Sequence, residues 1–413
     1  MKVGKPHNGE IGRTGPTGAT IGQIGEITKS PNLDSQPIMT TGPVQLLVIQ
    51  PTPFCNLDCS YCYLPNRNST ARMDWTTLEL AVKRVLESRF LGRVLSIVWH
   101  AGEPLVLPVD WYEEAFDRIE SLNSGRTSIT HHVQTNGVLI NERWIELFHS
   151  RGVQVGISLD GPERLHNAHR KTRTGTGTHH RVMSAIELLN TSKLDYHVIC
   201  VLTSAAMEAA DEVYDFFSDC GVRMVGFNIE EIEGSNTSSS LSRPGMVEAY
   251  RRFLARILEL AKADGSLRIR EFETARNLIL SRGWEPMNNQ QATPLQIVSV
   301  GVDGNMSTFS PELMGTRNPT YGDFIFGNVK NHRLEELLTD DSFTAVHEEI
   351  QSGIVACRNR CTYFMTCGGG APANKVFETG RFDVTETMFC RLACQAPIDV
   401  VLDDLETELG LNN

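Results

Sequence analysis

Residues 44–62 read VQLLVIQPTPFCNLDCSYC, an apolar run of strand length followed by a loop that carries Cys55, Cys59 and Cys62. Folds built from parallel strands and helices place their chemistry in the loops at the carboxyl ends of the strands. A strand that leads into a loop with three thiols therefore predicts an α/β fold with its functional site at that edge of the sheet.

The alternation of strand and helix continues to about residue 230. Apolar runs predict strands at 44–50, 94–100, 129–134, 153–159, 195–202 and 222–229. Helical spacing predicts helices at 74–88, with Asp74 as the candidate N-cap, and at 110–122, 141–151, 180–191 and 207–219. Six such units in succession predict a parallel sheet, and an open doubly wound sheet and a partial barrel both satisfy the pattern.

Polar motifs follow the predicted strands at the edge where a parallel sheet carries its site. His100-Ala101-Gly102-Glu103-Pro104 follows the second strand, Gln134-Thr135-Asn136-Gly137 the third, and Ser158-Leu159-Asp160-Gly161 the fourth. Because the carboxyl ends of parallel strands share one edge, these motifs and the cysteine loop are expected to lie together.

After residue 235 the alternation stops, which predicts further regions. A long helix is expected near 244–264, and a hairpin at 297–309 that turns at Asp303-Gly304. We divide the chain into a Gly- and Thr-rich leader expected to be flexible (1–40), an α/β core (41–235), a helical bridging region (236–296) and a cysteine-rich region (297–413).

Composition narrows the class of protein. The formal net charge of -12 over 413 residues disfavours nucleic acid, whose phosphates are bound by clustered Lys and Arg. No apolar run approaches the roughly 20 residues that span a membrane, and the first residues lack a secretory signal, so we expect no membrane association and a cytoplasmic location. In that compartment ten cysteines indicate metal or cluster ligation rather than disulfides, although Cys200 and Cys220 are expected to pack as small apolar residues.

The two cysteine groups each predict a metal centre. Cys55, Cys59 and Cys62 could bind three irons of a four-iron cubane and leave the fourth iron open to another ligand. In the second group Cys357, Cys361, Cys367 and Cys390 offer four thiolates, enough to close a cluster or a zinc site, with Cys394 as an alternative fourth ligand. For the first group the spacing favours a cluster over zinc, because the loop shows no fourth ligand, whereas for the second group spacing alone does not choose between iron and zinc.

The run Cys55-Asn-Leu-Asp-Cys59-Ser-Tyr-Cys62 resembles the signature of the radical S-adenosylmethionine (SAM) superfamily. The resemblance implies a partial (β/α)6 TIM-like barrel, a SAM-binding [4Fe-4S] cluster and SAM itself. Further residues match the family's cofactor-binding turns, although Ala101 stands where the family often has glycine. By similarity these are His100, Gly102 and Glu103 at the SAM amino group, Gln134 and Asn136 in the next turn, Ser158 at the ribose and Arg170 at the carboxylate.

The second cysteine group resembles the SPASM extension of peptide-modifying members, which carries auxiliary clusters. Phe309 and Ala371 stand where that family often has cysteines, so the resemblance implies one auxiliary [4Fe-4S] cluster rather than two. The segments 367–372 and 385–392 look like a narrower branch, the maturases of glycine-rich repeat peptides, which form cyclophanes.

By that resemblance the reaction joins an aromatic ring to a β-carbon in a ribosomal precursor peptide, and the cell supplies an electron donor such as flavodoxin or ferredoxin. Such a reaction needs a base, and Glu312 is the predicted one, with Glu230, Glu231 and Glu233 as alternatives. Two other interpretations stay open. One is a sulfatase-type (formylglycine-generating) or thioether-forming radical SAM maturase, and the other is a non-catalytic zinc protein.

Overall fold

A parallel sheet organises the structure, a computed structural model that describes residues 41–125, 127–280 and 286–411. The parallel strands, in spatial order, are β8 (Ile297–Val300), β1 (Val44–Ile49), β2 (Leu91–Trp99), β3 (Ser128–Thr135), β4 (Gln154–Ser158), β5 (Tyr196–Leu202), β6 (Met224–Ile229) and β7 (Arg268–Ile269). Antiparallel strands β9 (Asn305–Thr308) and β10 (Gly327–Asn328) extend the sheet beyond β8. Within the described ranges β7 and β10 end the sheet without pairing to each other.

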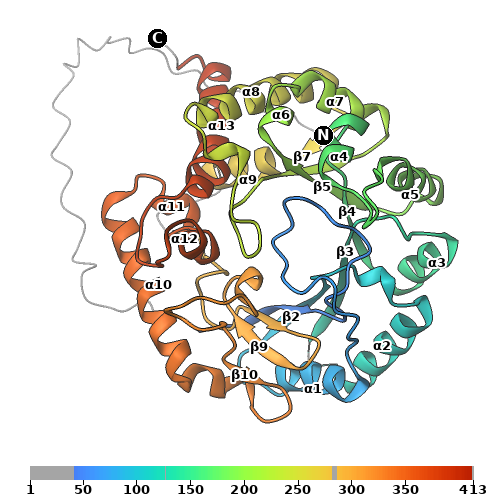
Figure 1. Cartoon of the computed structure of the whole chain (residues 1–413). Coiled ribbons are helices and arrows are strands. Elements are labelled where there is room, and N and C mark those ends of the chain that lie inside the picture. Colours follow the sequence, from blue (N-terminus) through green and yellow to red (C-terminus); the bar gives the residue numbers. More distant parts are fainter. Residues whose placement is uncertain (1–40, 126, 281–285, 412–413) are drawn as a thin grey trace, which may run out of the picture. The chain divides into compact units, whose positions relative to one another are not determined.

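Helices cover the outside of the curved sheet, while the strands line its interior (Figure 1). They are α1 (Trp75–Leu86), α2 (Val109–Leu122), α3 (Glu142–Arg151), α4 (Glu163–His169), α5 (His179–Ser192), α6 (Ser204–Met207) and α7 (Ala210–Asp219). The predicted α/β fold with a partial barrel is confirmed. On β1 and β2, Leu47, Ile49, Leu95 and Ile97 have no exposed surface. From Leu95 onward buried and partly buried residues alternate along β2, so one face of this strand is more deeply covered than the other.

Local signals in the sequence account for most of these elements. The carboxylate of Asp74 accepts a hydrogen bond from the Thr77 backbone N–H, which confirms it as the N-cap of α1. The predicted helix at 207–219 is wrong in its first residues, because the chain forms two helices, α6 and α7, that break at Ala209. Helix α4 was not predicted, since its seven residues are too few to display a helical period.

The second half of the chain contributes helices and the predicted hairpin. Strands β8 and β9 pair around a turn at residues 301–304, which confirms the hairpin. The helices are α8 (Met246–Asp264), α9 (Arg270–Leu280), α10 (Asp341–Arg360), α11 (Phe364–Cys367), α12 (Pro372–Thr379) and α13 (Ala396–Glu408), with a π-helix at Cys390–Gln395 before α13. Helix α13 packs against α8 and α9, so the end of the chain returns to the barrel.

The described residues belong to a single compact unit, and the predicted boundaries at 235 and 296 stay predictions. The predicted leader, residues 1–40, lies outside the described residues. Among the helices of the described ranges, none combines the length and the apolar character needed to cross a bilayer.

Candidate active site

One cavity of about 700 Å³ collects the predicted motifs at the carboxyl ends of the strands. Its wall also includes residues of α9, of the segments after β6 and β9, and of the cysteine-rich region. The predicted site residues that line it are Cys55, Cys59, Cys62, His100, Gly102, Glu103, Gln134, Asn136, Ser158, Arg170, Glu312 and Cys367. The remaining three predicted ligands, Cys357, Cys361 and Cys390, do not border the cavity.

The loop with Cys55, Cys59 and Cys62 is held by the turn that follows β3. The side-chain amide of Asn136 donates to the Asn56 side-chain oxygen at 2.8 Å and lies 3.9 Å from the Cys55 sulfur. Burial, with the nearby Glu103 carboxyl, raises the pKa of Cys55 to about 12, so this thiol needs a positive partner to become a ligand.

The donor set at this loop fits a cluster with an open iron. Within the described ranges, no three His, Cys, Asp or Glu side chains are grouped so that they could hold a metal ion. A cubane binds each cysteine at a different iron, so its ligands need not converge on a single ion. What must match is the number and kind of the ligands. Cys55, Cys59 and Cys62 supply three thiols on one loop, beside a cavity with room for a further ligand.

The turn after β2 follows a strained path. Ala101 and Gly102 have φ angles of 66° and 96°, in the left-handed region, and a Cβ atom on Gly102 would lie 2.3 Å from the Thr52 carbonyl oxygen. The close approach explains why glycine stands at position 102. His100, at the start of the turn, is within hydrogen-bond distance of the Tyr63 hydroxyl at 3.1 Å, and burial lowers the pKa of His100 to about 4.

Glu103 joins the ends of two strands. Its carboxylate accepts hydrogen bonds from the backbone N–H groups of Leu105 and Asn136 and from the Thr135 hydroxyl, at 3.0, 2.8 and 2.6 Å. The residue is 1% exposed, and burial raises its pKa to about 7. The predicted contact between Glu103 and the SAM amino group stays a prediction, and in the structure this carboxylate fixes the turns that border the cavity.

Gln134 and Ser158 meet on the cavity wall, where the Gln134 amide donates to the Ser158 hydroxyl at 3.1 Å. Gly156 leaves the space that Gln134 occupies, because a Cβ atom there would lie 2.1 Å from the Gln134 side-chain oxygen. Adjacent strands thus present the two predicted residues together.

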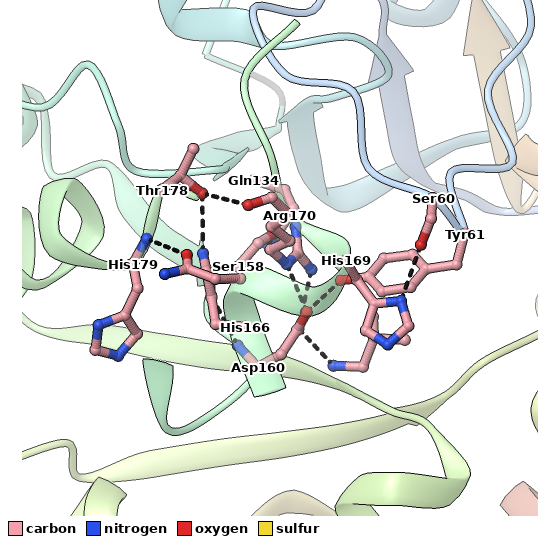
Figure 2. Close-up of polar contacts among 12 residues, drawn as sticks. Ser60, Tyr61, Gln134, Ser158, Asp160, His166, His169, Arg170, Thr178 and His179 are labelled. Atoms are coloured by element: carbon pink, nitrogen blue, oxygen red, sulfur yellow. Dashed lines mark hydrogen bonds and ion pairs between the residues drawn. The ribbon is translucent and has the colours of Figure 1, made fainter. Parts of the chain in front are cut away.

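Arg170 is paired inside the protein. Its Nε and Nη2 atoms donate to the two carboxylate oxygens of Asp160 at 2.9 and 3.2 Å, and the two side chains are 9% and 3% exposed (Figure 2). Burial opposes charge on Asp160, yet the Arg170 guanidinium holds the pKa of Asp160 below its ordinary value. The sequence motif contains Asp160, but its role was not predicted.

Three carboxyl groups on the cavity wall could accept a proton. Glu231 and Glu233 follow β6, and Glu312 lies in the 3-10 helix Pro311–Leu313 after β9. Burial raises the pKa of all three, to about 7 for Glu231, which accepts a hydrogen bond from the Asn374 amide at 2.7 Å.

Glu230 differs from these three carboxyls although it also borders the cavity. Its carboxylate accepts the Ser240 backbone N–H at 2.7 Å and also the Ser240 hydroxyl, so Glu230 closes a loop. Of the four predicted acidic candidates, Glu230 is therefore the one whose carboxylate is committed to local structure.

The second cysteine group is assembled from helices. Cys357 is in α10, Cys361 follows it, Cys367 ends α11, and Cys390 and Cys394 lie in the π-helix. Burial, with the Cys367 and Cys361 thiols, raises the pKa of Cys390 to about 12. Cys394 borders the cavity, and burial with the Cys367 thiol raises the pKa of Cys394 as well, so Cys390 and Cys394 both stay candidates for the fourth ligand.

A buried cation and backbone amides face the second group. The Lys375 ammonium lies 3.6 Å from the Cys357 sulfur and is 4% exposed as a residue. Backbone N–H groups of Gly369 and Gly370 favour the thiolate of Cys367. Hydrogen bonds and positive charge at cysteine sulfurs suit an anionic cluster, so this donor set fits one.

Phe309 occupies a dry aromatic cluster instead of a ligand position. It has no exposed surface, and its ring stacks on Phe343 with centroids 5.6 Å apart. Within the described ranges, the thiols that the chain offers after residue 296 are Cys357, Cys361, Cys367, Cys390 and Cys394.

Sequence reasoning missed three residues of the site. Asn374 and Lys375 belong to the short helix α12, whose sequence carries no motif, and their roles come from distant partners. Arg270 follows the two-residue strand β7, lines the cavity and donates to the Asn228 side-chain oxygen at 2.8 Å. Such a short strand leaves no period for sequence reasoning to detect.

Residues 49–217 match the sequence pattern of the Radical SAM superfamily. An uncharacterized protein of Synechocystis sp. is 42% identical over 379 residues, which cover 91% of this chain and 95% of that protein. A cysteine-type anaerobic sulfatase-maturating enzyme of Clostridium perfringens is 28% identical, with 79% of this chain and 88% of the enzyme covered.

Among solved structures, one described as "Native anSMEcpe with bound AdoMet and Cp18Cys peptide" has a similar fold. It has a TM-score of 0.70 and 23% sequence identity, and the alignment covers 90% of this chain and 100% of that chain. AdoMet is another abbreviation of SAM.

Proposed function

Because the chain belongs to the radical SAM superfamily and is therefore an enzyme that uses SAM and a [4Fe-4S] cluster, we propose that it is a maturase acting on a peptide. The observation that carries the proposal is the single cavity bordered by the first cysteine group, by Cys367 and Cys394 of the second, and by a set of carboxyl groups. A volume of about 700 Å³ can accept a cofactor together with a side chain of a larger substrate.

Relatives support a peptide as the substrate. The Clostridium perfringens relative is a sulfatase-maturating enzyme, and the similar solved structure holds both AdoMet and a peptide. The electron donor that we propose is a small redox protein such as flavodoxin or ferredoxin.

Cys55, Cys59 and Cys62 would hold the SAM-binding cluster, and Ser158 and Arg170 would contact SAM. When bound, the cluster and SAM supply a carbon radical that removes a hydrogen atom from the substrate. The chain's own residues position the substrate and keep other hydrogens and water away, which the buried residues of the cavity wall are suited to do.

A base would take the proton that the substrate loses in the second half of the reaction, and we propose Glu312 for it. Glu312 lines the cavity beside Glu231 and Glu233, and burial raises its pKa, so its carboxylate is a stronger proton acceptor than an exposed one. The second cysteine group would hold one auxiliary [4Fe-4S] cluster through Cys357, Cys361, Cys367 and either Cys390 or Cys394.

For the product, we propose a carbon–carbon cross-link between an aromatic ring and a β-carbon of a ribosomal precursor peptide, a cyclophane. This finer assignment rests on segments 367–372 and 385–392 and on Phe309, which fills an apolar cluster where a fuller set of cysteines would require a ligand. A sulfatase-type reaction that forms formylglycine is the second candidate, favoured by the sulfatase-maturating relative.

Mass spectrometry of a peptide substrate distinguishes the candidates. The anaerobically reconstituted enzyme would be incubated with SAM, dithionite and a short peptide encoded beside its gene. A cyclophane and a formylglycine made from serine both lack two hydrogens relative to the unmodified peptide, whereas a formylglycine made from cysteine also has oxygen in place of sulfur. A cross-link suppresses fragmentation between the joined residues, and an aldehyde reacts with a hydrazide probe. Suppressed fragmentation without hydrazide labelling is expected, and labelling would establish the second candidate instead.

A further inference from the structure

Asp160 is the centre of a buried hydrogen-bond network below the cysteine loop (Figure 2). Its two carboxylate oxygens accept the Tyr61 hydroxyl, two N–H groups of Arg170 and the Val201 backbone N–H. A carboxylate offers about four acceptor positions, so four donors occupy this one. Asp160 has no acceptor left for a bound molecule, and its role lies within the protein.

The network joins the cysteine loop to Arg170. Tyr61 is the residue before Cys62, and the Arg170 guanidinium lies over the Tyr61 ring, 5.4 Å from its centroid. Asp160 therefore holds the side chain of Tyr61 and that of Arg170 at the same carboxylate.

His166 fixes the backbone at both ends of this motif. The Asp160 backbone N–H donates to His166 Nδ1 at 3.3 Å, which makes Nδ1 the acceptor and leaves the proton on Nε2. That N–H donates to the Thr178 hydroxyl at 3.0 Å, and the hydroxyl donates to the Arg170 carbonyl at 3.0 Å (Figure 2). Burial lowers the pKa of His166 to about 3, in agreement with a neutral ring.

We propose that Asp160 is a positioning residue that orients Arg170 toward the carboxylate of SAM and couples Arg170 to the loop that carries the cluster cysteines. The inference goes beyond the reaction proposed above and rests on the proposed contact between Arg170 and SAM. Arg170 keeps N–H groups that Asp160 does not use, and the residue lines the cavity. Because Asp160 fixes the guanidinium of Arg170, this side chain loses little conformational freedom when an anion binds.

The affinity for SAM tests the proposal without any peptide, so its failure is distinguishable from failure of the proposed reaction. In Asp160→Asn an amide N–H would face the donors of Arg170, and we expect SAM to bind about 10- to 100-fold more weakly, the usual effect of losing an outer partner. Tyr61→Phe removes one hydroxyl and should weaken binding by a few-fold. Equilibrium dialysis of the reconstituted protein gives both affinities.

Controls and a second readout separate positioning from folding. Asp211→Asn and Tyr196→Phe remove an exposed ion pair with Arg256 and an exposed hydrogen bond to Asn190, and neither should change SAM affinity. Iron content and thermal unfolding check that each variant is intact. The change in the electron paramagnetic resonance spectrum of the reduced cluster on addition of SAM should be diminished in Asp160→Asn and retained in the controls.

A double-mutant cycle decides whether Asp160 acts through Arg170. In an Arg170→Gln background, Asp160→Asn should cause less than a twofold further loss of SAM affinity, because the arginine that it positions is gone. An equal, additive loss would overturn the proposal, as would unchanged affinity in an intact Asp160→Asn. If Asp160→Asn does not fold, the same cycle is measured with Tyr61→Phe in place of Asp160→Asn. An additive loss of SAM affinity in that cycle would also overturn the proposal.

Discussion

The two cysteine groups are presented by different kinds of structure. Cys55, Cys59 and Cys62 stand on a loop at the edge of a parallel sheet, where turns from neighbouring strands reach them. The second group stands on α10, α11 and the π-helix, with the buried Lys375 beside it. The sheet edge leaves one side of the first group open to the cavity, whereas the helices and the turn between α10 and α11 supply the five thiols of the second group.

Both groups have a cation near a thiol. Around the first group burial and the Glu103 carboxyl raise the pKa of Cys55, while Arg170 opposes the rise that burial causes in the pKa of Cys59. Around the second group Lys375 opposes the rise in the pKa of Cys357 in the same way. The number of thiols separates the groups, because three leave coordination for a cofactor to complete, whereas five exceed the four that close a cubane. The comparison predicts different consequences when each group is removed.

Removal of the first group should have the largest effect. With Cys55, Cys59 and Cys62 replaced by alanine, SAM cleavage should fall to background, because the SAM-binding cluster loses all three of its proposed protein ligands. Chromatography of 5′-deoxyadenosine measures this. Cys220→Ala, which alters a half-buried thiol outside both groups, is the control, and SAM cleavage retained by the triple variant would contradict the assignment.

Removal of the second group should separate SAM cleavage from product formation. Replacing Cys357 and Cys367 by alanine is expected to remove about four irons per chain, the content of one cubane, and to leave the first cluster in place. Deoxyadenosine should still form, while cross-linked peptide should not. Iron analysis and mass spectrometry provide the two measurements, and unchanged iron content would refute an auxiliary cluster.

Replacing Glu312 tests whether this carboxyl group on the cavity wall is the base. Glu312→Gln should lower the rate of peptide product about 10²- to 10⁴-fold, the usual contribution of a general base, without loss of SAM cleavage. Burial raises the pKa of Glu312, so the active carboxylate form appears only as the pH rises through that raised value. The rate of the unaltered enzyme should therefore fall at a higher pH than an ordinary glutamate would give.

The matched variant for this test is Glu230→Gln, because Glu230 borders the same cavity but accepts hydrogen bonds from Ser240. Glu230→Gln should keep the fall in rate at low pH that the unaltered enzyme shows. If Glu230→Gln and Glu312→Gln lower the rate equally, the effect is one of loop structure, and Glu312 is not the base.

The sequence predicted the first group better than the second, for a physical reason. A parallel sheet repeats a strand and a turn, so motifs after β1 to β4 could be placed at one edge from their order alone. The partners in the helical half depend on packing over long distances in the chain. Asn374 meets Glu231, and Lys375 meets Cys357, without a periodic signal that links them. Asp160 stands in a motif that the sequence placed at the sheet edge, but its contact with Tyr61, 99 residues away in the chain, has no such signal.

Ala101 offers the smallest and most local test of the comparison. The second group has glycines at 368–370 with positive φ, whereas the turn beside the first group holds alanine at φ 66°. Left-handed backbone costs a non-glycine residue roughly 1–2 kcal/mol, and glycine loses roughly 0.5–1 kcal/mol more on ordering. Ala101→Gly should therefore raise the free energy of unfolding by at most about 1.5 kcal/mol, as measured in urea.

Gly102→Ala is the counterpart, since its Cβ atom would meet the Thr52 carbonyl oxygen at 2.3 Å. This variant should be clearly destabilised, because that contact is with backbone and cannot be relieved by rotating a side chain. If Ala101→Gly destabilised the protein as much as Gly102→Ala, the turn would not hold Ala101 in the left-handed region, and the strain would have to lie elsewhere in the wall of the first site.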